Sequence, residues 1–166
     1  TKKPKLISKS NAPSRAQRVL KKGDILFQMV RPYQKNNYFF NLDGSYVAST
    51  GYAQLRANES ASFLYYFLHE DSFVKQVLQN CTGSNYPAIT STDLGKIPVK
   101  YPPHDEQTAI AQLLIKTDEE LQLLIDKREH LWKQKKYLLK NLISGTIRVP
   151  EIIAVSEKRQ KGVVYA

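Results

Sequence analysis

Basic side chains that could bind a polyanion are concentrated in the first 22 residues of the chain, where no acidic residue accompanies them. The 166-residue chain has a net charge of +10, and its remaining segments are close to neutral. A basic block beside a neutral domain is typical of polyanion binders, and in a cytoplasmic protein the polyanion is usually nucleic acid. The alternative is a solvated arm without a partner. The block consists of Lys2, Lys3, Lys5, Lys9, Arg15, Arg18, Lys21 and Lys22.

Polar residues in expected loops further along the chain suit hydrogen bonds to base edges. Arginine and lysine donors match the acceptors of guanine, and asparagine amides match adenine, which singles out Arg31, Lys35, Asn36, Asn37 and Asn85. The rings of Tyr33 and Tyr86 could stack on a sugar or a base of a distorted duplex, although a core position for Tyr86 is an equal alternative. For every one of these residues the competing interpretation is an ordinary polar side chain on the surface.

Groups for redox, zinc or nucleophilic chemistry are scarce. Cys81 is the only cysteine, which excludes an intrachain disulfide and a cysteine-based zinc cluster. The three histidines lack the spacing of a metal site. The segment Tyr101-Pro102-Pro103-His104 is similar to the core of the amino-methyltransferase motif, but the leading Asn or Asp and a glycine-rich cofactor loop are missing. We therefore expect no catalytic residue, no metal and no cofactor, with a methyltransferase fragment as a remote alternative.

Short apolar runs separated by turn residues predict a small mixed or antiparallel sheet with covering helices, an α+β fold. The run from Ile25 to Val30 follows the turn Gly23-Asp24 and predicts a buried strand. Asp43-Gly44 predicts a tight turn between strands at 38–40 and 46–48, and residues 51–55 predict another strand. One helix is expected from Asn58 or Ser60 to about Thr82, and Ile97-Pro98-Val99 is expected to be an edge strand.

A long coiled-coil-type helix is predicted after Pro102-Pro103, with Asp105 as its N-cap. Thr117-Asp118-Glu119-Glu120 repeats a capping pattern, which predicts either a bend or two successive helices. From Glu119 to Ser144 the helix would rise about 40 Å, more than one ~34 Å turn of B-DNA. Apolar residues at heptad spacing cover a wide arc, so we expect the helix to pair, preferably with an antiparallel partner. The expected pairing residues are Leu121, Leu124, Ile125, Arg128, Leu131, Trp132, Leu138, Leu139 and Leu142.

Several short motifs, in order and spacing over about residues 15 to 149, resemble the DNA specificity subunit of type I restriction-modification systems. The strongest piece is the Pro103, Glu106-Gln107 entry to a long helix that ends in Ser144-Gly145-Thr146-Ile147-Arg148. The supporting pieces are Gly23-Asp24-Ile25-Leu26, Val30-Arg31-Pro32, Ser49-Thr50-Gly51-Tyr52, Gly83-Ser84-Asn85-Tyr86-Pro87 and Leu94-Gly95-Lys96-Ile97-Pro98-Val99.

The resemblance implies a target recognition domain over residues 1–103, incomplete at its N-terminus, a spacer helix with an end strand over 104–149, and a tail over 150–166. It implies a subunit without catalysis of its own, which reads one half of a bipartite site in double-stranded DNA. Its partners would be the modification (methyltransferase) and restriction (motor) subunits, with a homodimer through the long helix if the chain is a half-subunit. The expected DNA-binding residues are Lys9, Asn11, Arg15, Arg31, Tyr33, Lys35, Asn36, Asn37, Ser49, Thr50, Ser84, Asn85 and Tyr86.

Two further expectations concern location and the competing function. No apolar run approaches the ~18 residues needed to cross a bilayer, so we expect a cytoplasmic protein that does not contact a membrane. The competing function is a coiled-coil adaptor whose basic arm binds RNA or nothing.

Overall fold

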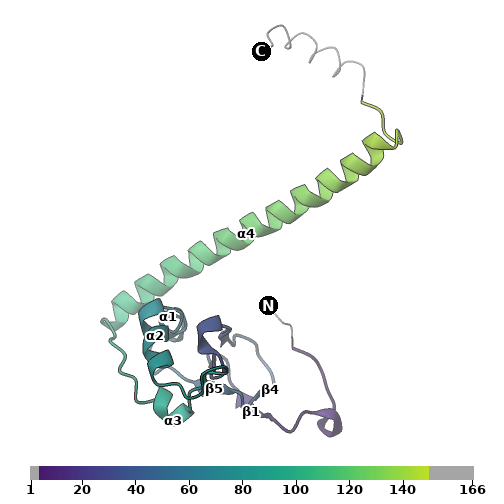
Figure 1. Cartoon of the computed structure of the whole chain (residues 1–166). Coiled ribbons are helices and arrows are strands. Elements are labelled where there is room, and N and C mark those ends of the chain that lie inside the picture. Colours follow the sequence, from purple (N-terminus) through teal and green to yellow (C-terminus); the bar gives the residue numbers. More distant parts are fainter. Residues whose placement is uncertain (1–3, 150–166) are drawn as a thin grey trace. The chain divides into compact units, whose positions relative to one another are not determined.

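The computed structural model describes residues 4–149, and the chain divides into two compact units at Ile115 and Lys116. The first unit contains five strands, three α-helices and the start of a fourth helix, α4, whose remainder lies in the second unit (Figure 1). The expected tail over residues 150–166 falls outside the described residues. Among the helices that are described, none is long and apolar enough to cross a membrane.

A three-stranded antiparallel sheet, ordered β3-β2-β5, carries the main core of the first unit. Its central strand β2 (Ile25–Gln28) is the apolar run that the sequence predicts, and Ile25 and Phe27 are fully buried. The flanking strands are β3 (Tyr38–Phe39) and β5 (Tyr52–Leu55). Burial of the alternating apolar side chains against the helices, rather than strand propensity, accounts for most of the stability of so small a sheet.

The expected hairpin between residues 38–40 and 46–48 is wrong. Strand β4 (Tyr46–Ser49) pairs antiparallel with β1 (Ala16–Leu20) in a separate two-stranded ribbon, whereas β3 pairs with β2. The reason lies in Phe40, which is 1% exposed and continues the pairing beyond β3. Its N–H donates to the carbonyl of Asp24, and its carbonyl accepts from the Gly23 N–H, both at 2.8 Å.

Asp24, which the sequence suggested only as a turn residue, is a fully buried carboxylate that joins the ribbon to the sheet. It accepts hydrogen bonds from the backbone N–H of Lys21 at 2.7 Å, from Gln54 Nε2 at 2.7 Å, and from Arg56 Nε at 2.8 Å. Gln54 Nε2 also donates to the Val19 carbonyl at 2.9 Å. Burial raises the pKa of Asp24, but the hydrogen bonds from Arg56, Lys21 and Gln54 outweigh it, and the pKa lies below its ordinary value.

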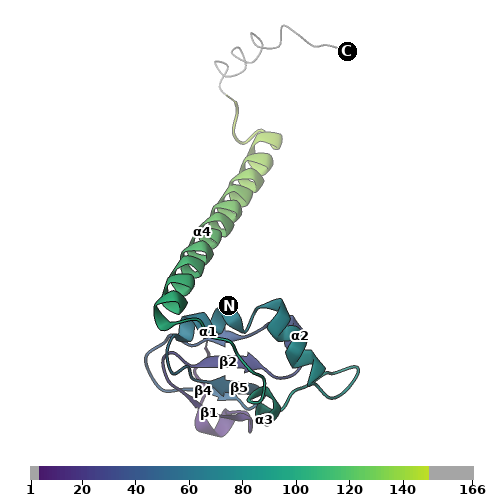
Figure 2. The ribbon, with the colours of Figure 1, turned by 90° about the vertical axis from the view of Figure 1, so that its left-hand side faces the viewer.

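Two helices, α1 (Ala61–Phe67) and α2 (Asp71–Gln79), replace the single helix expected over this region. Ser60, one of the two caps predicted, caps α1: its Oγ accepts from the Phe63 N–H at 3.2 Å. A second cap, Glu70, accepts from the Phe73 N–H at 2.9 Å and starts α2 anew. Both helices lie on the side of the sheet opposite the β1–β4 ribbon (Figure 2), and Leu64, Leu68, Phe73 and Val77 from them join the main core.

The edge strand expected at Ile97-Pro98-Val99 does not form. The short helix α3 (Ser91–Leu94), capped by Thr90, precedes it, and the segment then continues as irregular backbone with Ile97 buried in the core. Packing of Ile97 against the core therefore replaces ladder hydrogen bonds in holding this segment.

Helix α4 (His104–Ile143) is continuous over 40 residues, so no second helix begins at Thr117. Within the first unit, Gln107 is 2% exposed and donates through Nε2 to Glu59 Oε2 at 2.6 Å and to the Pro102 carbonyl at 2.9 Å. After α4, residues 144–149 form turns and irregular backbone where we expected an end strand.

Candidate functional site

Two loops that are far apart in the sequence meet at one edge of the first unit. The first contains the 3-10 turn η2 (Pro32–Gln34), and the second covers residues 82–87. The Arg31 N–H donates to the Pro87 carbonyl at 2.7 Å, and the Ile89 N–H donates to the Met29 carbonyl at 3.1 Å. These backbone bonds bring five predicted DNA-binding residues of the first loop and three of the second into one region, which we call the two-loop site. It consists of Arg31, Tyr33, Lys35, Asn36, Asn37, Ser84, Asn85 and Tyr86, together with Gln34 of the first loop.

Arg31 and Tyr86 contact each other across the two-loop site. The guanidinium carbon of Arg31 lies 4.2 Å from the centroid of the Tyr86 ring, a cation–π geometry. Tyr86 is 65% exposed, which rules out the alternative of a core residue. The backbone of Arg31 is left-handed, with φ 54° and ψ 56°, a conformation that side chains other than glycine, asparagine and aspartate rarely adopt.

A network of carboxamides holds the first loop in place, and sequence reasoning missed half of it. Gln28 Nε2 donates to Gln34 Oε1 at 3.0 Å, and the Asn36 N–H donates to Gln28 Oε1 at 3.2 Å. Asn37 Oδ1 accepts from the Gln28 N–H at 2.9 Å, so this amide oxygen is engaged in holding the loop. The sequence pointed to Gln34 only through its position between two candidate residues. Nothing in the sequence pointed to Gln28, because it ends a buried strand.

Lys35 and Tyr33 lie on the same loop in different settings. Lys35 also has left-handed backbone, with φ 52°, and its ammonium forms an ion pair with Asp71 in the first turn of α2. Its charge is therefore partly neutralised within the protein. Tyr33 is exposed, as are Ser84 and Asn85 in the second loop. Their side chains are thus available to a ligand.

A second group of predicted residues lies on the β1–β4 ribbon. The Thr50 N–H donates to the Arg15 carbonyl at 2.9 Å, and Ser49 pairs with Ala16 across the ribbon. Ser49 Oγ accepts from the Gly51 N–H at 3.2 Å. Arg15 is exposed and lines an open hollow with the N-terminal segment. Lys9 and Asn11 lie in the 3-10 turn η1 (Lys9–Asn11) that precedes β1.

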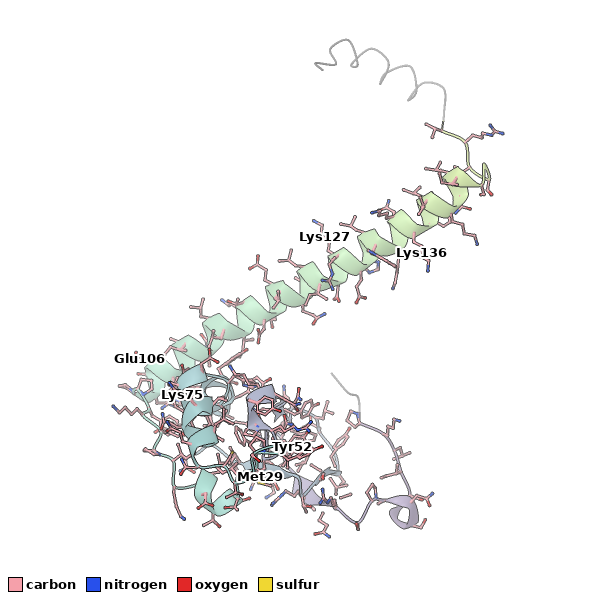
Figure 3. The ribbon with its side chains drawn as sticks, viewed as in Figure 1. Met29, Tyr52, Lys75, Glu106, Lys127 and Lys136 are labelled. Atoms are coloured by element: carbon pink, nitrogen blue, oxygen red, sulfur yellow. The ribbon has the colours of Figure 1, made fainter. Side chains whose placement is uncertain are left out.

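The predicted pairing residues of α4 form an uncovered apolar stripe in the second unit. Eight of the nine are exposed and Ile125 is half-buried. The charges on α4 are unevenly distributed: residues 104–125 carry five acids and one lysine, whereas residues 126–143 carry two acids and six bases. Figure 3 labels Lys127 and Lys136 in this basic half. The helix thus has an acidic and a basic half as well as an apolar stripe.

The described residues contain no group of three or more His, Cys, Asp and Glu side chains able to hold a metal ion. Burial alone raises the pKa of the Cys81 thiol, which disfavours its thiolate. The chemistry available in the two-loop site is therefore hydrogen bonding, stacking and positive charge.

Comparison with known proteins agrees with this chemistry. The type I restriction modification DNA specificity domain matches residues 4–133. The MjaX type I restriction enzyme specificity subunit of Methanocaldococcus jannaschii is 32% identical over 103 residues, which are 60% of this chain and 24% of that protein. The HindI specificity subunit of Haemophilus influenzae is 25% identical over 118 residues, 67% of this chain and 26% of that protein.

A solved structure gives the same result for the fold. The crystal structure of the HsdS subunit from Thermoanaerobacter tengcongensis aligns with a TM-score of 0.66 and 29% identity, over 89% of this chain and 39% of that one. The chain spans about a quarter of the length of the curated relatives that it matches. The predicted fold class, short helices on small antiparallel sheets followed by a long helix, is confirmed. Since the match covers most of the chain, the resemblance found in the sequence is confirmed, and the protein belongs to the type I restriction modification DNA specificity domain family.

Proposed function

We propose that the chain is the DNA-reading part of a type I restriction-modification specificity subunit, which recognises one half of a bipartite site in double-stranded DNA and performs no catalysis itself. The observation that carries the proposal is the match of residues 4–133 to a DNA specificity domain. It agrees with the chemistry of the two-loop site. The domain boundaries expected from the sequence, 1–103 for recognition and 104–149 for the spacer, are part of this proposal.

Affinity and specificity would come from different residues. The basic segment before and within β1 supplies cations for phosphates, which bind DNA without regard to sequence. The two-loop site supplies the arginine, amide and tyrosine groups that can distinguish bases. Binding should therefore weaken steeply as salt rises, while the preference for the cognate half-site persists.

The uncovered stripe of α4 supports the second part of the proposal, pairing with another long helix. Leucines and Trp132 at heptad spacing favour a helical partner. An antiparallel copy would place the acidic half of each helix opposite the basic half of the other, whereas a parallel copy would oppose like charges. We infer an antiparallel homodimer when no other specificity chain is present, and docking of the modification and restriction subunits onto the paired helices.

Selection of binding sites tests the DNA-reading role. The full chain would be incubated with a library of randomised duplexes, and the retained sequences would be compared with a scrambled competitor. The expected result is a short preferred sequence bound about 1,000-fold or more tightly than scrambled DNA. Retention of all sequences alike, with dimerisation intact, would instead favour the nucleic-acid-binding adaptor.

Paired aspartate substitutions test the helix-pairing role. Leu124→Asp with Leu131→Asp should convert the dimer to monomers, because charges would be buried in the apolar seam. Leu123→Asp is a matched control, because Leu123 is 69% exposed and lies outside the heptad stripe. Sedimentation equilibrium gives the mass of each variant. A double variant with the mass of the unmodified chain would contradict pairing through this stripe.

A further inference from the structure

The Arg31–Tyr86 pair holds one arginine side chain in a defined position at the surface of the two-loop site. We propose that Arg31 is the residue that determines a guanine at one position of the half-site, and that Tyr86 is the positioning residue that holds the Arg31 guanidinium for this contact. The inference rests on the proposed DNA-binding function and goes beyond it by naming the base and the residue that reads it.

The backbone on both sides of the η2 turn supports a fixed presentation of Arg31. Arg31 and Lys35, which flank η2, both have positive φ, and they are the only described residues other than glycine that do. Strained backbone of this kind persists where the surrounding structure holds it, and it concentrates at binding sites. Here the surroundings are the Pro87 carbonyl, which accepts the Arg31 N–H at 2.7 Å, and the buried ring of Pro32. The origin of the Arg31 side chain is therefore fixed before any ligand binds.

The position of the side chain is fixed by Tyr86. The Arg31 guanidinium carbon lies over the Tyr86 ring, 4.2 Å from its centroid, and the attraction between the cation and the ring restricts where the guanidinium can lie. Among the residues that the structure describes, no carboxylate forms an ion pair with Arg31, and its Nε is buried without a hydrogen-bond partner. The charge and the terminal Nη donors of Arg31 thus remain for a ligand, whereas the buried Nε does not.

The neighbouring candidates are engaged within the protein. The Lys35 ammonium pairs with Asp71. The side-chain oxygen of Asn37 and the amide groups of Gln28 and Gln34 take part in the carboxamide network. Arg31 is therefore the cation of this loop that is both fixed in place and free of an acid, which distinguishes it from the lysines of the basic segment.

Guanine is the base whose edge matches this arginine. Its N7 and O6 form a pair of acceptors in the major groove, and a guanidinium bonds both at once through its planar fork. A phosphate also offers paired acceptors, so the experiment must separate the two. Because the Arg31 side chain is already held in place, it loses less conformational entropy on binding than a mobile side chain would. This favours a contact that needs one defined geometry, such as two hydrogen bonds to one base.

The experiment begins with the half-site selected by the full chain. Arg31→Ala should abolish the preference for guanine at one position and reduce affinity for the selected duplex by about 5- to 150-fold, with little effect on scrambled DNA. Replacing that guanine with 7-deazaguanine, which lacks the N7 acceptor, should weaken binding of the unmodified chain. The same replacement should have no effect on Arg31→Ala, because the interaction is already lost.

Variants of Tyr86 separate positioning from direct contact. Tyr86→Leu should reduce the affinity for the selected duplex by about 2- to 30-fold and shrink the penalty of 7-deazaguanine, because the guanidinium loses its aromatic platform. Tyr86→Phe retains the ring and is the matched control, with the 7-deazaguanine penalty unchanged. Circular dichroism would establish that each variant is folded.

Three results would overturn the inference. Equal losses of Arg31→Ala on selected and scrambled duplexes, with a smaller salt dependence, would assign Arg31 to a phosphate. A 7-deazaguanine penalty that stays the same in Arg31→Ala would assign the guanine to another residue, and a selected site without guanine would exclude the contact. In each case the DNA-reading function would stand. Absence of any sequence preference in the unmodified chain would instead refute the proposed function, and the inference with it.

Discussion

Substitution of Asp24 by asparagine should destabilise the first unit more than any exposed charge change. The fully buried carboxylate accepts from Lys21, from Gln54 and twice from Arg56, with the second guanidinium bond at 3.0 Å. Asparagine keeps the shape and one acceptor but presents an NH₂ group to donors and removes the charge. The Arg56 side chain is 55% exposed, so water can hydrate its guanidinium once the ion pair with Asp24 is gone, and this hydration limits the loss of stability. We expect a decrease of about 2–4 kcal/mol in the free energy of unfolding.

Differential scanning calorimetry would measure this loss as a decrease of about 10–25 °C in the melting temperature of the first unit. Tryptophan fluorescence is unsuitable, because Trp132 lies on α4 in the second unit. Asp43→Asn is the control, since its ion pair with Lys22 is exposed and should contribute less than about 1 kcal/mol. Equal melting temperatures for Asp24→Asn and Asp43→Asn would refute the role assigned to Asp24 in joining the ribbon to the sheet.

The pH dependence gives an independent test of the same residue. The pKa of folded Asp24 lies below its ordinary value, which is about 4 in an unfolded chain. Its contribution to stability is therefore complete above that value and is lost as the pH falls toward the lower folded pKa. The difference in stability between the unmodified chain and Asp24→Asn should be constant from about pH 7 to 5 and should shrink below about pH 4. A difference that widened on acidification would contradict the sign of this shift.

Two further substitutions test the second loop and the start of α4. Gly83→Ala should weaken the sequence preference of the two-loop site, because Gly83 has φ +86° and an added Cβ would lie 3.1 Å from the Tyr86 carbonyl oxygen. In the control Gly51→Ala, the added Cβ meets only Ser49 Oγ, at 3.5 Å. Equal DNA selectivity of the two variants would show that the backbone conformation of Gly83 does not matter for recognition. Gln107→Leu should lower the free energy of unfolding of the first unit by about 1–3 kcal/mol, because it removes the hydrogen bonds to Glu59 and Pro102. Calorimetry measures the change, and an unchanged melting temperature would show that these bonds make no net contribution to stability.

The sequence predicted the elements whose burial is periodic and failed where pairing depends on distant residues. Strand β2 and helix α4 follow directly from an uninterrupted apolar run and from heptad spacing. Strand β1 was hidden in the basic segment, since its residues are alternately half-buried and exposed and only Leu20 is buried. The break between α1 and α2 was missed because both helices contribute apolar residues at compatible spacing, and the Glu70 cap interrupts them without proline or glycine.

Prediction of the two-loop site also failed where contacts depend on residues distant in the sequence. Arg31 and Tyr86 were both candidates from their residue types, but their contact depends on how α1 and α2 return the chain to the end of β2. The ion pair of Lys35 with Asp71 and the engagement of Asn37 by the Gln28 N–H were equally inaccessible. These contacts separate residues that hold the loop from residues that remain for a ligand, a distinction that composition alone does not make.

Helix α4 is continuous and carries an exposed apolar stripe and two oppositely charged halves. Capping residues at Thr117 to Glu120 favour a new helix start, yet the helix continues through them. A helix of 40 residues rises about 60 Å. Several leucines of this helix are exposed, and an exposed apolar stripe of this kind supports the proposed pairing with a partner helix. Because acidic and basic residues occupy opposite halves, reversing the charges at Lys133, Lys135 and Lys136 should weaken antiparallel pairing, which the leucine pattern alone would not predict.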